Sequence, residues 1–421
     1  MIRSLLVSFA LCMATVLCVS QSPAQVVDRT SLNEKVMCGY QGWFNCPGDD
    51  ADLGWTHWAK NSRKPFAMGN VTVDLWPDMS QYDADERFAT GFQNADGTAA
   101  EVFSSANRKT VIRHFKWMQD YAIDGAFVQR FANGLKNPQD LKHKNNVLAA
   151  AREGSNLHGR TFAVMYDLSG IRSGGLDTVQ QDWLSLQKES PVASDDAYLH
   201  HDGQPVVAIW GIGFNDGRQY SLAQCLQLVN WFKAQGCTVM VGVPSFWRDR
   251  QRDALDDPLL HQILKRADIV SPWSVGRYQT PKQARQHAQQ VWAADRKWCE
   301  QFELDFLPVV FPGFSWHNMK GDKLDAVPRL KGEFLWSQIV GAKRAGCNMI
   351  YVAMFDEVDE ATAIFKCTNN PPVGDGVSFL DYEGLPSDYY LRLVGHAGRL
   401  LRGEVKATDQ LTIEPENLPD R

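Results

Sequence analysis

Four carboxylates occur within five residues of the segment from Asn348 to Thr362: Asp356, Glu357, Asp359 and Glu360. The residues just before them, Met349 to Phe355, form an unbroken apolar run, which is typical of a strand buried on both faces. Carboxylates this close repel one another, and burial raises their pKa values further. Packing does not explain such a cluster at the end of a buried strand. The pattern therefore favours a site that needs an acid beside a base, or a metal, over a solvated acidic loop.

Two of these carboxylates could serve glycoside hydrolysis, which needs one protonated and one ionised carboxyl group flanking the bond. Glu357 and Glu360 can supply them. Three residues apart, they point to opposite faces of a straight strand. They share a pocket only if the chain turns at Val358 and Asp359, and Asp356 and Asp359 then support the pair or form the turn.

The chain that positions these residues alternates between strand-like and helical segments. The expected strands cover 35–40, 125–130, 161–166, 205–210, 237–243, 267–270, 306–311 and 349–355. The expected helices cover 110–121, 142–157, 178–189, 222–234, 258–265, 282–300, 334–345 and 388–401. Eight such units indicate a parallel sheet covered on both faces, and they predict an α/β fold, a (β/α)8 TIM barrel. An open doubly wound sheet is the alternative.

The first βα connection is too long for an ordinary loop. Residues 44–108 are rich in Gly, Asp and Trp and include a strand-like piece, Val71–Trp76. We interpret them as an insertion after strand 1 that forms part of a cleft wall at the C-terminal face of the barrel. Since no linker interrupts the alternation, residues 25–421 are expected to form one domain.

Residues 1–24 have the pattern of a secretory signal peptide, with Arg3, an apolar run from Leu5 to Val19, and small residues before the expected cleavage point. This predicts an exported protein, periplasmic or extracellular, without a membrane span. The mature chain keeps seven Cys, an odd number, and their connectivity does not follow from the sequence.

Charge and motifs narrow the function further. The formal charge of −6 and the lack of a basic block give no electrostatic footprint for nucleic acid. We find no dinucleotide-binding or Walker motif and no zinc spacing, so no cofactor and no metal is expected. A monomer is expected as well.

A barrel of this kind has its active site at the C-terminal ends of the strands. Trp occurs at five of the eight expected ends, and Trp55, Trp58 and Trp76 lie in the insertion. Each Trp alone is equally compatible with core packing. Together with the carboxylates they favour a carbohydrate cleft, because aromatic faces cover the C–H faces of sugar rings. Around the catalytic pair Glu357 and Glu360, the expected substrate-binding residues are Tyr40, Trp43, Gln129, Arg130, Tyr166, Asp167, Trp210, Trp247, Trp273, Trp316, His317, Asp356 and Asp359.

The segment 355–362, Phe-Asp-Glu-Val-Asp-Glu-Ala-Thr, resembles the Phe-Asn-Glu-Trp-His-Glu-Gly-Thr signature of glycoside hydrolase family 99. Segments 39–43, 123–127, 165–167 and 309–314 agree with that family in order, and the second and third of these also resemble family 71. Residues 381–391 are similar to bacterial family 99-like proteins, some of them labelled xylosidase or arabinosidase.

The resemblance implies a retaining hydrolase of an α-linked, mannan-like or glucan-like glycan that acts through a 1,2-anhydro sugar. It implies that Glu357 deprotonates the 2-hydroxyl and that Glu360 is the acid and base. Four of the eight signature positions differ, so the reaction class is better supported than a mannan substrate.

Two other functions are compatible with the same residues. One is a non-catalytic glycan-binding barrel, which turnover on an α-linked polysaccharide would distinguish from a hydrolase. The other is a metal-dependent hydrolase that uses the acidic cluster, although its spacing matches no calcium loop. Metal dependence of activity would identify that case.

Overall fold

The structure is a computed structural model that describes residues 26–411 except 173 and 375. The signal peptide expected at residues 1–24 lies outside this range, and so do Cys12 and Cys18.

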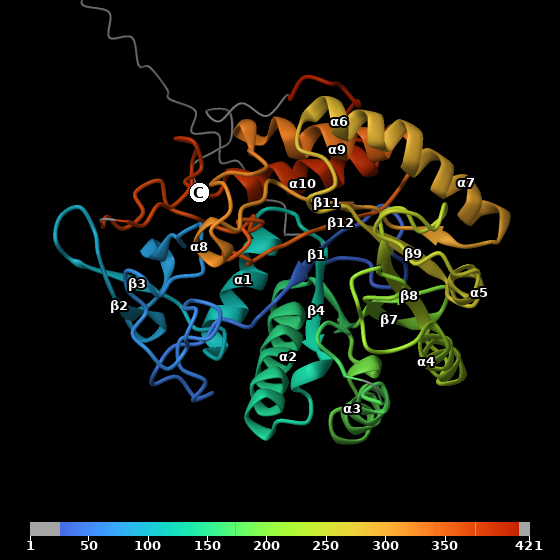
Figure 1. Cartoon of the computed structure of the whole chain (residues 1–421), viewed down its shortest axis with the longest axis horizontal. Coiled ribbons are helices and arrows are strands. Elements are labelled where there is room, and N and C mark those ends of the chain that lie inside the picture. The colour runs from blue at the N-terminus through green and yellow to red at the C-terminus, as the bar shows by residue number, and fades with distance from the viewer. Residues whose placement is uncertain (1–25, 173, 375, 412–421) are drawn as a thin grey trace, which may run out of the picture.

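Parallel strands form the centre of the molecule, and helices surround them (Figure 1). The strands of this sheet, apart from one short antiparallel addition, are β1 (Val36–Tyr40), β4 (Gly125–Phe131), β5 (Thr161–Asp167), β7 (Gln204–Trp210), β8 (Thr238–Pro244), β9 (Ile269–Trp273), β10 (Asp305–Phe306), β11 (Val309–Val310) and β12 (Ile350–Val352). The addition, β6 (His200–His201), pairs with β7.

The sheet closes into a barrel because its two edges belong to one segment of chain. The strand order is β10–β9–β8–β7–β5–β4–β1–β12–β11, with β10 paired to β9 and β11 paired to β12. Leu307 and Pro308, which separate β10 from β11, continue the pairing: the Leu307 amide donates to Val270 and the Tyr351 amide donates to Pro308. β10 and β11 are thus two halves of the seventh strand, and the predicted (β/α)8 barrel is confirmed.

The helices lie on the outside of the barrel. They are α1 (Arg108–Asp120), α2 (Pro138–His158), α3 (Asp177–Glu189), α4 (Leu222–Ala234), α5 (Leu259–Leu264), α6 (Pro281–His287), α7 (Ala293–Gln301), α8 (His317–Lys320), α9 (Glu333–Arg344) and α10 (Tyr389–Leu401). A π-helical stretch, Ala288–Trp292, joins α6 to α7. Short 3-10 turns cover Met79–Gln81, Ala84–Glu86, Ala132–Gly134, Val192–Ser194 and Leu330–Gly332. The eight helices expected from the sequence are all present, with bounds shifted by at most a few residues.

The insertion after β1 differs from the expectation in detail. Val71–Trp76 forms no strand, although Leu75 makes an isolated bridge to Leu380. The sequence did not indicate the antiparallel hairpin of β2 (Phe88–Gln93) and β3 (Ala99–Val102). The hairpin gives a weak sequence signal, since every residue of β2 except Phe92 is exposed or only partly buried.

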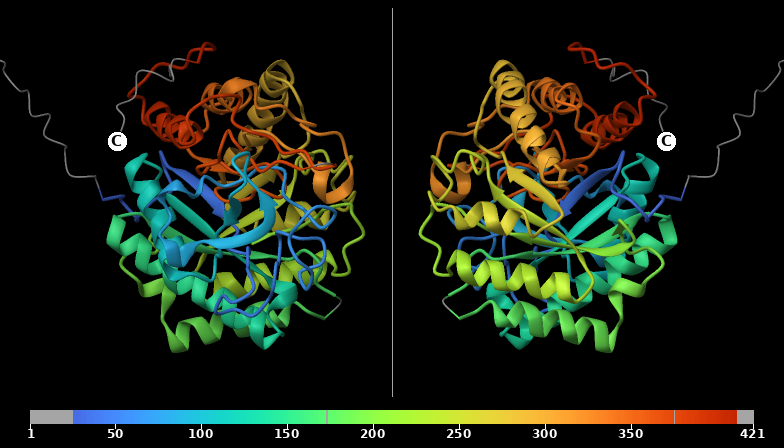
Figure 2. Two further views of the ribbon diagram at one scale, coloured as in Figure 1. Left: turned by 90° about the vertical axis from the view of Figure 1, so that its left-hand side faces the viewer. Right: turned by 90° about the vertical axis from the view of Figure 1, so that its right-hand side faces the viewer.

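The insertion lies at the C-terminal face of the barrel, as predicted. The Asp74 and Leu75 amides donate to the carbonyl of Val358, just beyond β12. The Asp74 carboxylate also accepts the amides of His317 and Asn318, after β11, at 2.7 and 2.8 Å. In the left view of Figure 2 the insertion lies in front of the barrel.

The three Trp of the insertion form its core instead of an exposed wall. Trp55, Trp58 and Trp76 are at most 9% exposed. Their rings lie 5.6, 5.8 and 5.5 Å from the ring of Phe66. The expectation that these faces cover sugar rings is therefore wrong, because the three rings are buried and pack on Phe66 inside the insertion.

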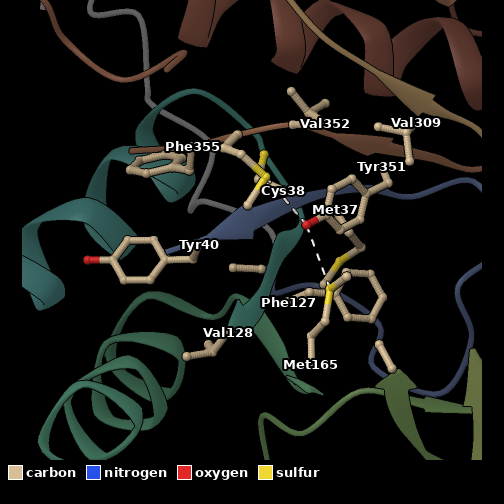
Figure 3. Packing of buried hydrophobic residues seen from close by; sticks show 14 of the residues in the cluster. Met37, Cys38, Tyr40, Phe127, Val128, Met165, Val309, Tyr351, Val352 and Phe355 are labelled. Atoms are coloured by element: carbon tan, nitrogen blue, oxygen red, sulfur yellow. Dashed lines mark hydrogen bonds between the residues drawn. The ribbon is translucent and has the colours of Figure 1, made fainter. Parts of the chain in front are cut away.

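Side chains of each strand alternate between the barrel interior and the helices. A Cβ atom on Gly39 would lie 2.0 Å from the Tyr351 hydroxyl, so Gly39 faces the interior and leaves room for that ring. The Tyr351 hydroxyl lies 3.7 Å from the sulfur of Met165 and 3.5 Å from that of Met354 (Figure 3). Phe127 stacks on Tyr351, so large side chains fill the barrel below its C-terminal face.

All seven cysteines of the described residues are buried free thiols. Among the described helices, none combines the length and the apolar character that crossing a membrane would need.

A glycine fixes how closely α10 packs on the turn after α1. A Cβ atom on Gly395 would lie 1.8 Å from the carbonyl oxygen of Tyr121, which is backbone and cannot move aside cheaply. Gly398, one turn further along α10, would meet only the flexible guanidinium of Arg402, at 3.1 Å.

We predict that Gly395→Ala lowers the free energy of unfolding by about 1–3 kcal/mol, the usual cost of overpacking. Gly398→Ala is the matched control and should be neutral or stabilising by up to about 1 kcal/mol, because Ala favours a helix. Urea unfolding of the two variants makes the comparison. Equal effects of the two substitutions would contradict the close contact.

Candidate active site

Asp356 joins the loop after β12 to the loop after β1. Its two carboxylate oxygens accept the backbone amides of Gln41 and Gly42, at 2.8 and 2.9 Å, and the side chain is fully buried. Burial raises the pKa of Asp356 to about 7 in spite of these two bonds. Because no part of the side chain is exposed, Asp356 has a structural role, which corrects its expected role in substrate binding.

Glu357 is held by two side-chain donors. The Gln41 amide nitrogen donates to one carboxylate oxygen at 2.6 Å, and the Thr362 hydroxyl donates to the other at 2.6 Å. The residue is 3% exposed. Burial, followed by the charges of Glu360 and Asp359, raises the pKa of Glu357 well above its usual range.

Glu360 is the more exposed of the expected catalytic pair, with a partly buried side chain. Its carbonyl accepts the Ser315 amide at 2.9 Å, which links it to the loop after β11. Burial, followed by the charge of Asp359, raises the pKa of Glu360 to about 8, and the charge of Asp167 adds to this rise.

The chain turns between the two glutamates, as the sequence analysis required. The Thr362 and Ala363 amides both donate to the carbonyl of Glu357, at 3.1 and 2.9 Å, which folds the segment back on itself. Glu357 and Glu360 are close enough for the charge of Glu360 to raise the pKa of Glu357. That the two carboxyl groups flank one substrate bond stays a prediction.

Two expected binding residues lie in the barrel interior under this turn. Asp167 ends β5, is 7% exposed, and accepts the Ser169 amide at 2.7 Å. Burial raises the pKa of Asp167 to about 6. Gln129 donates from its amide nitrogen to the Tyr351 hydroxyl at 3.2 Å and is 6% exposed.

The neighbours of these two residues in the sequence point the other way. The Arg130 guanidinium forms an ion pair with Asp182 of α3, with 2.8 Å from Nε to the carboxylate, and is fully buried. The Tyr166 hydroxyl donates to the same carboxylate at 2.7 Å. The expectation that Arg130 and Tyr166 bind substrate is wrong, because strand alternation turns both side chains toward α3.

Tyr40 and Trp247 are also buried away from the C-terminal face. The Tyr40 hydroxyl lies 2.9 Å from Nδ1 of His114, which is on α1. Trp247 packs edge to face on Trp298 of α7 with ring centroids 4.9 Å apart. Both side chains are 0% exposed, so their expected contact with substrate is corrected to a packing role.

Partly exposed aromatic rings remain at the ends of β7 and β9. Trp210 and Trp273 meet edge to face at 5.3 Å. The Arg218 guanidinium lies 4.9 Å from the centroid of the Trp210 ring, and Phe214 packs on the same ring at 4.8 Å. These contacts hold the two Trp rings at the C-terminal face, and both stay predicted binding residues.

The loop after β11 contributes Trp316 and His317, which are both partly exposed. The Trp316 ring packs on Phe314 at 5.0 Å. The Nδ1 atom of His317 lies 2.8 Å from the carbonyl of Asp322, so this ring is tied to its own loop. Both residues stay predicted binding residues.

Asp359 is 1% exposed and contacts His57 of the insertion, 3.0 Å from its Nδ1 atom. The His57 ring in turn stacks on Trp43, with ring centroids 3.7 Å apart. Asp359 therefore does not reach the surface itself. It contacts the ring of His57, which is partly exposed.

Three residues of this site have contacts that the sequence does not indicate: Gln41, His57 and Thr362. Gln41 follows strand 1 directly and Thr362 belongs to the acidic segment, so their positions in the sequence could have indicated that they lie close to Glu357. Nothing in the sequence pairs His57 with Asp359, because the contact spans about 300 residues of chain.

The four carboxylates do not converge as metal ligands. Asp356, Glu357 and Asp359 each point to a different partner, as described above. Among the described residues, the group whose ligand atoms lie within 4.8 Å of one another is His201, Asp202 and Asp305, at the opposite end of the barrel. There the Leu32 amide donates to Nδ1 of His201, which places the ring hydrogen on Nε2, the atom that a metal would need.

Two cavities lie outside the carboxylate loop. One of about 700 Å³ lies between α2 and α3 on the outside of the barrel, and its lining includes Asp182. Another, of about 310 Å³, lies between the loops after β5 and β7, where residues 169–172 and 216–220 line it. Neither is lined by Glu357 or Glu360.

Comparisons with known proteins support the architecture. No family model and no curated protein matches the sequence. Among solved structures, the glycoside hydrolase family 99 endo-α-mannosidase from Bacteroides thetaiotaomicron superposes with a TM-score of 0.62 at 16% identity, over 89% of this chain and 99% of that one. The chain has the fold of this enzyme.

Two further solved structures agree. The same endo-α-mannosidase in complex with bis-tris propane has a TM-score of 0.62 at 15% identity, over 89% of this chain and 99% of that one. A glycoside hydrolase-like protein has a TM-score of 0.52 at 14% identity, over 89% of this chain and 96% of that one. The fold thus agrees with the resemblance to family 99 carried by the carboxylate loop.

Burial of Glu360 has a consequence for stability. Its pKa in the folded chain, about 8, lies above the ordinary value of 4.5, so between these values the folded state binds a proton that the unfolded state releases. Stability therefore falls as pH rises through this window.

We predict that Glu360→Gln makes the protein more stable than the wild type at pH 8, by about 1–2 kcal/mol, because the variant carries no charge there. Near pH 5 the two should differ little. Urea unfolding at both pH values measures this, with Glu300→Gln on the exposed side of α7 as the control. A difference between variant and wild type that does not change with pH would contradict the burial of this charge.

Proposed function

We propose that the protein is a glycoside hydrolase that cleaves an α-linked, mannan-like or glucan-like glycan with retention of configuration. The observation that carries this proposal is the pair Glu357 and Glu360, two carboxyl groups with raised pKa values in one turn at the C-terminal end of β12. This is the end of the barrel at which such enzymes act. The fold shared with the family 99 enzyme is consistent with it.

The hydrogen bonds divide the roles of the two glutamates. Gln41 and Thr362 donate to both oxygens of Glu357, which favours its ionised form. Burial and negative neighbours raise the pKa of both glutamates, but these two side-chain donors bind Glu357 and not Glu360, and Glu360 is the more exposed of the two. We therefore assign the proton of the pair to Glu360, which makes Glu357 the base and Glu360 the acid.

The proposed reaction has two steps whose protons balance. Glu357 removes the proton of the 2-hydroxyl, and that oxygen attacks the anomeric carbon while Glu360 protonates the leaving glycosidic oxygen. In the second step Glu360 takes a proton from water as the water attacks the anomeric carbon of the 1,2-anhydro sugar. Glu357 then returns its proton to the 2-oxygen, so both carboxyl groups regain their initial states.

Asp167 supports the acid. Its charge is among the causes that raise the pKa of Glu360, and so keeps Glu360 protonated near neutral pH. Trp210, Trp273 and Trp316 are the aromatic rings that a glycan would contact. Export by residues 1–24 and a monomeric state stay predictions from the sequence.

We predict that Glu360→Gln lowers kcat by about 10²–10⁴-fold on an α-linked oligosaccharide, because the amide keeps the shape and cannot donate the proton. Glu357→Gln should have a loss of similar order. The double variant should lose much less than the product of the two, since both residues act on one event. Steady-state kinetics measure this, with Glu300→Gln as the control. Unchanged turnover in Glu360→Gln would contradict the assignment of Glu360 as the acid. A wild-type protein that binds glycan without turnover would instead be a non-catalytic glycan-binding barrel.

A second prediction concerns pH. Because Glu360 must be protonated to act as the acid, kcat/KM should fall as pH rises past about 8. Asp167→Asn removes a negative neighbour, so the pKa of Glu360 falls and the alkaline limb of the profile moves to lower pH.

The control for the pH profile is Asp177→Asn, at the exposed start of α3. It should leave the alkaline limb in place. A limb that stays unchanged in Asp167→Asn would show that Asp167 does not act on the acid.

A further inference from the structure

His57 has a backbone conformation that histidine adopts infrequently. Its φ is +64°, in the left-handed region. A residue other than Gly in this region costs on the order of 1 kcal/mol, and it persists where surrounding contacts determine it. His57 lies in the insertion between Trp55 and Trp58, which are both buried in the insertion's own core.

The first contact that determines His57 is with Trp43. The two rings are nearly parallel, at 5°, with centroids 3.7 Å apart. Phe131 also packs against Trp43, at 4.9 Å. Trp43 therefore supports the imidazole ring. Its faces are covered and do not form a free platform for a sugar, which corrects the expectation from the sequence that Trp43 binds substrate.

The second contact fixes which ring nitrogen carries the hydrogen. Nδ1 of His57 lies 3.0 Å from a carboxylate oxygen of Asp359. A carboxylate only accepts, so Nδ1 donates, and in the neutral ring Nε2 is left with a lone pair. Among the described residues, no hydrogen-bond partner contacts Nε2 of His57.

The His57 ring remains partly exposed. The side chain is 33% exposed, whereas that of Asp359 is 1% exposed. The edge with Nδ1 faces the buried carboxylate and one ring face is covered by Trp43. Asp359 directly precedes Glu360 in the chain, so His57 contacts the residue next to the proposed acid, at the C-terminal face.

We propose that His57 is a glycan-binding residue, whose Nε2 accepts a hydrogen bond from a hydroxyl group of the sugar bound beside Glu360. Asp359 fixes the tautomer and Trp43 fixes the plane of the ring. The inference rests on the proposed function, because it takes the ligand of this face to be an α-linked glycan. It gives the insertion a direct part in substrate selection.

The test measures binding without turnover, in the Glu360→Gln background, by titration calorimetry with linear α-manno- and α-gluco-tetrasaccharides. A neutral hydrogen bond contributes about 0.5–1.5 kcal/mol, so we expect His57→Ala to raise Kd by about 2–13-fold. His57→Phe keeps a ring to stack on Trp43 and lacks the acceptor, so it should lose a similar factor. His57→Gln offers an acceptor oxygen and should recover part of the loss.

Monodeoxy versions of the bound tetrasaccharide identify the hydroxyl group. One of them should bind more weakly than the parent to the protein with His57, and should bind like the parent to His57→Ala. His158→Ala, on the outer helix α2, is the matched control and should leave every Kd unchanged. Urea unfolding checks that each variant is folded.

The outcomes separate the two proposals. If His57→Ala and His57→Phe bind the tetrasaccharide with the parent Kd, the inference is overturned and the hydrolase proposal stands. If no α-linked tetrasaccharide binds to the Glu360→Gln protein, the proposed function fails and takes the inference with it. A loss confined to His57→Ala, with normal binding by His57→Phe, would show a packing role and would also overturn it.

Discussion

Negative charge buried at the end of β12 is the constraint on which the rest of the site depends. Asp356 and Glu357 are almost completely buried, and the loop after β1 supplies three of the donors that satisfy them, from Gln41 and Gly42. The two loops come together because β1 and β12 are neighbours in the closed barrel. Without these donors a buried carboxylate would cost several kcal/mol. The carboxylates at the end of β12 therefore depend on the pairing of β1 with β12, which brings the donors to them.

The order and type of the barrel elements could be predicted from the sequence because local patterns determine them. Short apolar runs alternate with helical spacing from residue 110 onward, and the structure has those strands and helices. The direction in which individual side chains point at the strand ends was harder to predict. Gln129 faces the interior whereas Arg130 faces α3, and one residue of shift in an expected strand end exchanges them.

Contacts within the insertion could not be predicted, since they join residues far apart in the chain and follow no local period. His57 reaches Asp359, and Asp74 binds the amides of His317 and Asn318. The carboxylate segment was recognised because its chemistry is concentrated in a few adjacent residues. The residues that contact this segment were not recognised, because the loop after β1, the insertion and the loop after β11 each contribute only one or two side chains.

The central claim is that Glu357 and Glu360 act on one glycosidic bond. A crystal structure of the Glu360→Gln protein with a bound α-linked oligosaccharide tests it most directly. The account predicts the amide of residue 360 within hydrogen-bond distance of the glycosidic oxygen, and the Glu357 carboxylate at the 2-hydroxyl of the sugar whose anomeric carbon is attacked. An oligosaccharide whose scissile bond contacts residue 360 alone, with Glu357 still enclosed by Gln41 and Thr362 and away from the sugar, would contradict it.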